Sequence, residues 1–196
     1  MSDKLTIKQA IDSYNQHGDE YYGPAMRQAL LGYSEHKNNE PLRNDSYVDA
    51  LFLTDIMLQR TLRSMEVLTG KCVEQFLGVL KDPFIAALQR IKNVGKGSAR
   101  FILVDAESVP PILLELKKAG LPVEIKRGRT VDGAKVTHLI VCDGKMLRDE
   151  EYHGVLTETT PAEEIKAKVY MNSPVHAKVA QAHFNGIWNC LPALEG

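Results

Sequence analysis

The dipeptide Asp143-Gly144 constrains this chain more than any other feature, because it lies between two runs that are typical of strands. Residues 136–142 (VTHLIVC) alternate as a strand does, and residues 145–148 (KMLR) follow the dipeptide. Asp-Gly favours a type I′ turn, in which both central residues need a positive φ angle. The sequence therefore predicts a β-hairpin over residues 135–151, with His138 as a polar candidate for burial on its first strand.

Strand and helix patterns alternate in the stretch that leads to this hairpin. Strands are predicted at residues 64–70, 100–105 and 123–126, and helices at 73–91 and 110–119, with Pro83 expected to kink or split the first helix. A further strand at 165–172 and a helix from Pro174 follow the hairpin. Parallel strands joined by helices need those helices to cover the sheet. The predicted fold class is therefore α/β, a mixed sheet flanked by helices.

The first third of the chain has a different pattern. Helical spacing of apolar residues recurs at 5–14, 24–34 and 46–62, with a polar loop at 36–41 and a capping residue among Asn44, Asp45 and Ser46. Residues 1–62 are thus predicted to be a helical N-terminal extension of an α/β domain over 63–196. The apolar stripes of its second and third helices need a partner surface, which would be the domain itself or a second copy of the chain.

Composition excludes several classes of protein. The 24 Lys and Arg residues nearly balance 25 Asp and Glu, so no global basic field points to nucleic acid. Cys72, Cys142 and Cys190 form no CxxC pair, which argues against a disulfide framework or a zinc site. No apolar run approaches the ~18 residues of a membrane span, and no leader segment is evident. We expect a cytoplasmic protein with no metal, cofactor or membrane contact.

Two histidines are the candidates for chemistry. His138 on its strand could bind a ligand or transfer protons, since histidine titrates near neutral pH; the alternative is a histidine satisfied by hydrogen bonds beside the core. His153 follows Glu150 and Glu151, and a histidine near carboxylates is typical of an acid/base pair or a metal site. The alternative for His153 is a solvated loop.

A basic cluster is the candidate anion site. Lys126, Arg127 and Arg129 follow a predicted strand end, around Gly128. Ligands often bind at the ends of parallel strands, so the cluster could hold an anion or a nucleic-acid phosphate. The alternative is a charged loop in solvent.

The order of elements over residues 64–190 resembles one half of the phospholipase D-like fold. Active members of that family carry H-x-K, four further residues and Asp, where the His attacks a phosphodiester and the Lys binds its phosphate. Aligning the family Asp with Asp143 places Val136 at the His position and His138 at the Lys position. An alkyl group cannot replace a nucleophile, so the resemblance implies the fold without the chemistry. The literal H-x-K at His176–Lys178 falls in a predicted helix, where residues two apart face different directions.

The preferred interpretation is a non-catalytic phospholipase D-like binding or regulatory module. The family builds one active site from two such halves, so the resemblance implies a homodimer with the hairpin near the shared interface. One alternative is a phosphodiesterase or nuclease with a rearranged site that uses His138, His153 and the basic cluster. A second alternative is a regulatory protein associated with nucleic acid, and a protein partner is also compatible with the sequence.

Overall fold

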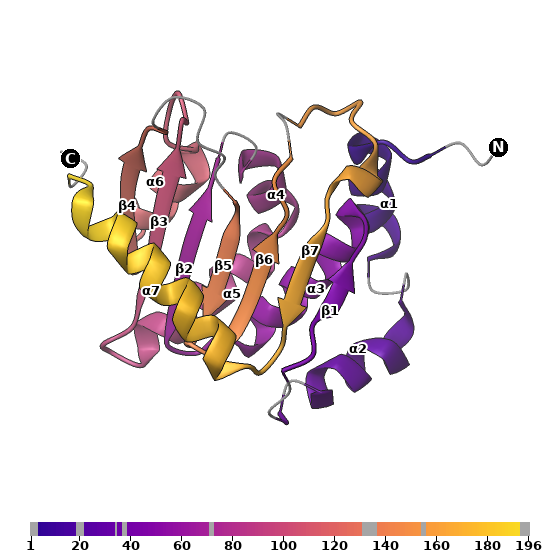
Figure 1. Cartoon of the computed structure of the whole chain (residues 1–196), viewed down its shortest axis with the longest axis horizontal. Helices are drawn as coiled ribbons and strands as arrows, with labels where there is room; N and C mark the ends of the chain where they lie inside the picture. The colour runs from indigo at the N-terminus through magenta and orange to yellow at the C-terminus, as the bar shows by residue number, and fades with distance from the viewer. Residues whose placement is uncertain are drawn as a thin grey trace.

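The computed structural model describes residues 4–18, 22–33, 35–36, 39–70, 73–130, 137–153 and 156–192. Seven strands in these ranges form one mixed sheet in the order β1-β7-β6-β5-β2-β3-β4 (Figure 1). The strands are β1 (Leu42–Asn44), β2 (Ser64–Thr69), β3 (Ser98–Val104), β4 (Val123–Gly128), β5 (Leu139–Cys142), β6 (Met146–Glu150) and β7 (Ala167–Tyr170). The helices are α1 (Ile7–His17), α2 (Gly23–Tyr33), α3 (Tyr47–Arg60), α4 (Val73–Val79), α5 (Lys81–Asn93), α6 (Pro111–Lys118) and α7 (Pro174–Cys190), with a 3-10 turn at Ala162–Glu164.

The predicted α/β class is confirmed, and the sheet is mixed, with three of its seven strands parallel. Strands β2, β3 and β4 run parallel, and β5 joins β2 in the antiparallel sense. The last four residues of β3 are buried without interruption, which explains the apolar run in the sequence, because a parallel strand is covered on both faces. The helices that connect these strands cover one of the two faces.

Two helical layers enclose the sheet (Figure 1). Helix α7 crosses one face, where Phe184 packs in a cluster with Leu68 and Ile102. Helices α3 and α5 lie on the other face, where Phe84 meets Phe101 with ring centroids 5.7 Å apart. Side chains alternate between these two layers along each strand, so each strand residue belongs to one layer or the other.

The hairpin between β5 and β6 forms where the sequence predicts it. Asp143 and Gly144 have φ angles of 54° and 59°, and the N–H of Lys145 donates to the carbonyl of Cys142 over 3.1 Å. Both central residues thus have the positive φ that a type I′ turn requires. Cys142 lies opposite Met146, so Lys145 also belongs to the loop and the register is one residue longer than a two-residue turn would give.

The structure also departs from the predicted elements. The segment before residue 62, expected to hold helices joined by loops, also contains β1, which pairs antiparallel with β7 at the edge of the sheet. The helix predicted over 73–91 is split, as expected for Pro83, but the break lies at Leu80, between α4 and α5. Pro83 is the third residue of α5, in a first turn whose N–H groups have no helical partner, so proline is tolerated there.

The three N-terminal helices differ in how they are buried. Ser46 caps helix α3, since its side chain accepts from the N–H of Asp49, and eleven residues of α3 are buried. Helix α2 has no buried residue among those described, and an ion pair of 2.6 Å between Arg27 and Asp55 ties it to α3. Within the described ranges, no helix combines the length and apolar character that a membrane span requires.

Candidate functional site

Three neighbouring strands place Thr69, His138 and Glu150 in one row. Thr69 ends β2, His138 precedes β5 and Glu150 ends β6. One further step along the β2–β5 and β5–β6 registers sets Thr69 beside His138 and His138 beside Glu150. The N–H of Glu150 donates to the carbonyl of His138 over 2.9 Å, which extends the ladder to this row. Alternation along the strands turns the side chains toward the layer that holds α3 and α5.

Backbone geometry fixes the protonation of His138. The N–H of Gly70 donates to Nδ1 over 3.3 Å, and Oγ1 of Thr69 lies 3.1 Å from the same nitrogen. Nδ1 must therefore be unprotonated, because an N–H donor needs a lone pair. Burial, together with the charges of His153 and Arg148, lowers the pKa of His138, although Glu150 opposes that shift. His138 is thus a neutral imidazole at pH 7 and carries its hydrogen on Nε2.

Glu150 is a buried carboxylate with two strong partners. Arg148, two residues earlier on the same face of β6, forms an ion pair with Oε2, and Nε2 of His153 lies 2.5 Å from Oε1. Burial alone would raise the pKa of Glu150, but Arg148 and His153 more than offset it and lower the value to about 2. An ionised carboxylate only accepts hydrogen bonds, so His153 must carry a hydrogen on Nε2.

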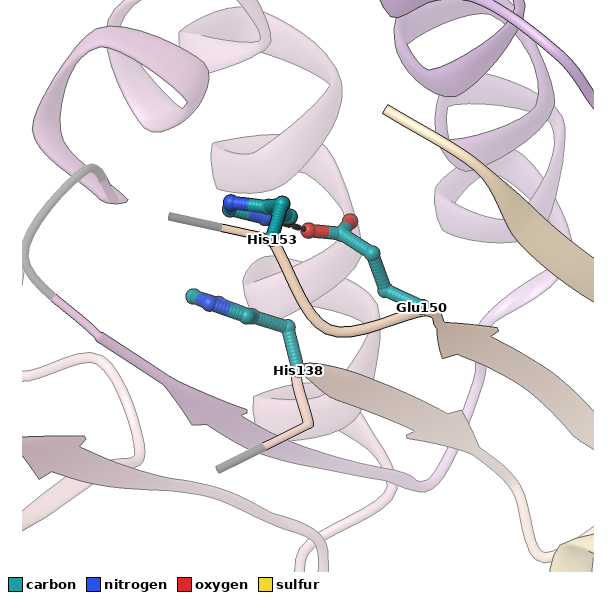
Figure 2. A group of neighbouring side chains, drawn as sticks. All are labelled: His138, Glu150 and His153. Carbon is teal, nitrogen blue, oxygen red and sulfur yellow. Dashed lines mark hydrogen bonds and ion pairs between the residues drawn. The ribbon is translucent and has the colours of Figure 1, made fainter. Parts of the chain in front are cut away.

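The two candidate histidines lie against each other. Figure 2 shows the ring of His153 above that of His138, with Glu150 to one side of the pair. The ring centroids are 4.9 Å apart and the planes differ by 16°, so the rings are stacked. The side chain of His153 is only 6% exposed, so it does not lie in a solvated loop.

This trio also has the spacing of a possible metal site. One ligand atom from each of His138, Glu150 and His153 lies within 4.8 Å of the other two. A histidine lone pair lies in the plane of its ring, however, and two nearly parallel rings cannot aim their lone pairs at one ion. Nδ1 of His138 and Nε2 of His153 are also already hydrogen-bonded. Shared coordination therefore requires a ring to rotate, and the absence of a metal stays a prediction.

A cavity of about 60 Å³ lies beside this trio. Its walls are mainly apolar side chains from α3, β2, α4, α5 and β5, and its polar lining includes His138, Arg148, Glu150, His153 and Thr54. A mainly apolar cavity with a few polar groups is the usual form of a small-molecule site. The arrangement suits the binding of a small molecule better than the activation of a nucleophile.

Two residues of the predicted basic cluster bind backbone carbonyls of the chain itself. Nζ of Lys126 donates to the carbonyls of Trp188 and Leu191 at the end of α7, over 2.8 and 2.7 Å. Arg127 donates to two backbone carbonyls of the loop after β3, over 2.5 and 2.9 Å. Arg129 is exposed. Two of the three cations thus stabilise the fold, and the structure does not gather the three around one anion site.

The residues aligned with the family motif fall in separate places. Val136 lies outside the described residues. Asp143 lies at the hairpin tip, at the opposite end of β5 from His138, where its carboxylate accepts the backbone N–H groups of Leu62, Arg63 and Ser64 over 2.7 to 3.2 Å. Asp143 therefore joins the hairpin to the start of β2 and takes no part in the candidate site.

The literal H-x-K sequence is helical, as predicted. His176 lies in the first turn of α7, where Nδ1 is 2.8 Å from the hydroxyl of Ser173 and the ring stacks on Tyr170. Lys178 is exposed. Because residues two apart on a helix face different directions, His176 and Lys178 do not form a phosphate site on one face.

Sequence reasoning missed Arg148 and Thr54. Arg148 could have been found from the hairpin alone, because it lies two residues before Glu150 and so shares its face of β6. Thr54 carries no such signal, since it lies on α3, which meets the cavity only through tertiary packing.

Comparison with known proteins identifies solved structures of similar fold. No family profile and no curated protein matches the sequence. Among solved structures, the chain is similar to TrmBL2, an archaeal chromatin protein, with a TM-score of 0.57 and 13% identity over 96% of this chain and 65% of that one. This chain thus spans less than two thirds of TrmBL2.

Two further solved structures are also similar. The first is Nuc from Salmonella typhimurium, a phospholipase D family member, with a TM-score of 0.53 and 14% identity over 80% of this chain and 100% of that one. NucT from Helicobacter pylori has a TM-score of 0.48 and 7% identity over 87% and 94%. The likeness to Nuc agrees with the mixed sheet and its flanking helices. The chain therefore has the phospholipase D-like fold.

Proposed function

We propose that this chain is a non-catalytic phospholipase D-like module that acts by binding. The observation that carries the proposal is the state of His138, which stands where the resemblance places a phosphate-binding Lys. Its Nδ1 accepts the N–H of Gly70, and its lowered pKa leaves the ring neutral. A neutral imidazole does not supply the positive charge with which a phosphodiesterase stabilises its phosphoryl oxygens.

The remaining groups of the site also support binding rather than catalysis. Val136 stands at the family's nucleophile position, and a valine side chain cannot attack phosphorus. Glu150 has a pKa of about 2, which makes it a poor general acid or base near neutral pH. Its oxygens are already engaged by Arg148 and His153.

Hydrolysis assays test this proposal. Wild type, His138→Ala and the control His183→Ala, which changes an exposed histidine of α7, are incubated with bis(p-nitrophenyl) phosphate and with DNA, each with and without divalent metal. We expect no turnover above the protein-free blank. Turnover by wild type and His183→Ala that disappears in His138→Ala would refute the proposal and support the rearranged phosphodiesterase or nuclease.

We also propose that the module is a homodimer in the cytoplasm. The support is the resemblance, in which two halves of this fold come together around one site. Sedimentation velocity over a range of protein concentrations tests the assembly. A species of one chain mass, about 22 kDa, at all concentrations would refute it.

Association with nucleic acid is the second candidate function. It is favoured by the likeness to TrmBL2, a chromatin protein that binds DNA and that matches nearly the whole of this chain. Fluorescence anisotropy with duplex DNA at 50 and 200 mM salt tests it, with Arg127→Ala and Arg129→Ala as variants. Binding that weakens with salt and in the variants would favour this candidate, because phosphate contacts release counterions. No binding at low salt would eliminate it.

A further inference from the structure

The buried hydroxyl of Thr54 indicates that the cavity binds a ligand. Thr54 lines the cavity from α3 and is 2% exposed, and among the described residues its Oγ1 has no hydrogen-bond partner. Buried hydroxyl groups in folded proteins are nearly always hydrogen-bonded, and an exception points to a ligand or an ordered water. A polar atom of a bound molecule would satisfy this group.

The charges around the cavity indicate that the molecule is neutral. Arg148 forms an ion pair with Glu150 and also contacts the carbonyl oxygen of the Asn44 side chain over 3.4 Å, so its guanidinium is committed. Glu150 accepts from His153 as well, and His138 is neutral. An anionic ligand would find no uncommitted cation among these lining residues, and a cationic ligand no uncommitted carboxylate. A charge left unpaired in such a place is costly.

The volume and the wall of the cavity indicate the size and the apolar character of its ligand. A volume of about 60 Å³ is several times the ~10–15 Å³ that one water needs, so it accommodates roughly four to six groups of that size. Apolar side chains such as Leu58, Met65 and Phe84 form most of the wall. Apolar walls favour an apolar body, because burying it removes it from water.

We infer that this cavity binds a small neutral molecule with an apolar body and one hydroxyl or carbonyl group, which hydrogen-bonds to Thr54 Oγ1. The inference deepens the proposed binding function by naming the ligand class and a residue that recognises it. Recognition by one hydroxyl is specific because the analogue without a polar group leaves Thr54 unpaired.

A matched pair of ligands and a matched pair of variants test the inference. The probes are 1-butanol and n-pentane, which have the same number of non-hydrogen atoms, and butyrate as an anionic analogue. Methyl NMR titration of the full chain follows Leu58 and Met65 at the cavity, with Leu147 on the opposite layer as an internal reference. We expect saturable shifts at the cavity methyls for butanol and weaker binding of butyrate.

Thr54→Val removes the hydroxyl and keeps the shape of the side chain. We expect it to weaken butanol binding by roughly 3- to 10-fold, the value of one neutral hydrogen bond, and not to weaken pentane binding, because pentane leaves the Thr54 hydroxyl unpaired in wild type. The control is Thr61→Val, because the hydroxyl of Thr61 bonds the carbonyl of Met57 over 2.8 Å and Thr61 is not part of the cavity wall. That variant should bind both probes as wild type does.

Three results would overturn the inference. No saturable shift with either probe would mean that the cavity holds ordered water only. Equal loss of butanol and pentane in Thr54→Val would assign the effect to shape, and butyrate binding as tightly as butanol would contradict a neutral ligand. None of these results would refute the proposed function. The proposed function fails only if the chain hydrolyses a phosphodiester in a reaction that depends on His138.

Discussion

Glu150 allows the electrostatics of the site to be tested quantitatively. Its pKa falls from an ordinary 4.5 to about 2, and at 1.36 kcal/mol per pKa unit this corresponds to about 3 kcal/mol of stability at pH 7. Because the pKa is depressed in the folded state, this stability is fully present above pH 4.5. It is lost as the pH falls from about 4.5 toward 2, where the folded chain also takes up the proton.

The perturbation is Glu150→Gln, which removes the charge and keeps the size. Arg148 is 4% exposed and would lose its counterion, so we expect the variant to be about 3 to 5 kcal/mol less stable than wild type at pH 7. The difference should shrink toward pH 2, because wild type then loses the same charge. Urea unfolding followed by circular dichroism at pH 2 to 7 measures the difference between the two proteins at each pH.

A second variant keeps this test informative if Glu150→Gln fails to fold. Arg148→Met combined with Glu150→Gln removes both charges, and we expect it to recover much of the lost stability, since no unpaired charge stays buried. A loss below 1 kcal/mol for Glu150→Gln at pH 7 would refute the reasoning. So would a difference that stays constant between pH 2 and pH 6.

Three further predictions concern other parts of the molecule. Asp143→Asn keeps the tolerance for positive φ but loses the charge that accepts three backbone N–H groups, so urea unfolding should show a loss of about 1 to 2 kcal/mol; unchanged stability would contradict the structural role of Asp143. Burial raises the pKa of the Cys142 thiol to about 12, so peptide mapping after brief iodoacetamide treatment of the folded chain should find Cys190 modified and Cys142 intact; modification of Cys142 at a similar rate would contradict its burial. Stacking of His138 and His153 predicts no stoichiometric Zn²⁺ binding in calorimetry, whereas 1:1 binding that disappears in His153→Ala would show that a ring rotates to form a site.

Local chemistry explains which parts of the fold could be predicted. The hairpin follows from Asp143-Gly144, because the turn needs only its own residues. Counting outward from a two-residue turn would pair His138 with Asp149, but Cys142 lies opposite Met146, so His138 lies beside Glu150 instead. The sequence thus predicts that His138 lies near the end of β6, and the observed register selects Glu150 as its neighbour. The uninterrupted apolar run of β3 similarly reflects its burial on both faces.

Long-range contacts explain what the sequence did not reveal. Strand β1 is three residues long, and it is stabilised by β7, which lies far along the chain. Thr69 reaches His138 only because β5 pairs with β2, a pairing that no local pattern encodes. Lys126 donates to carbonyls at the end of α7, a contact that no local pattern around Lys126 indicates. In each case tertiary structure supplies the partner.

We propose that a neutral imidazole, His138, stands where the resemblance to phospholipase D-like enzymes places a phosphate-binding lysine. Two-bond ¹⁵N–¹H NMR spectra of the histidine rings, recorded from pH 5 to pH 8, measure the protonation of each His138 nitrogen directly. The account predicts an unprotonated Nδ1 and a protonated Nε2 at pH 7, with titration below the ordinary pKa of 6.5. A His138 ring that carries hydrogens on both nitrogens at pH 7 would contradict it.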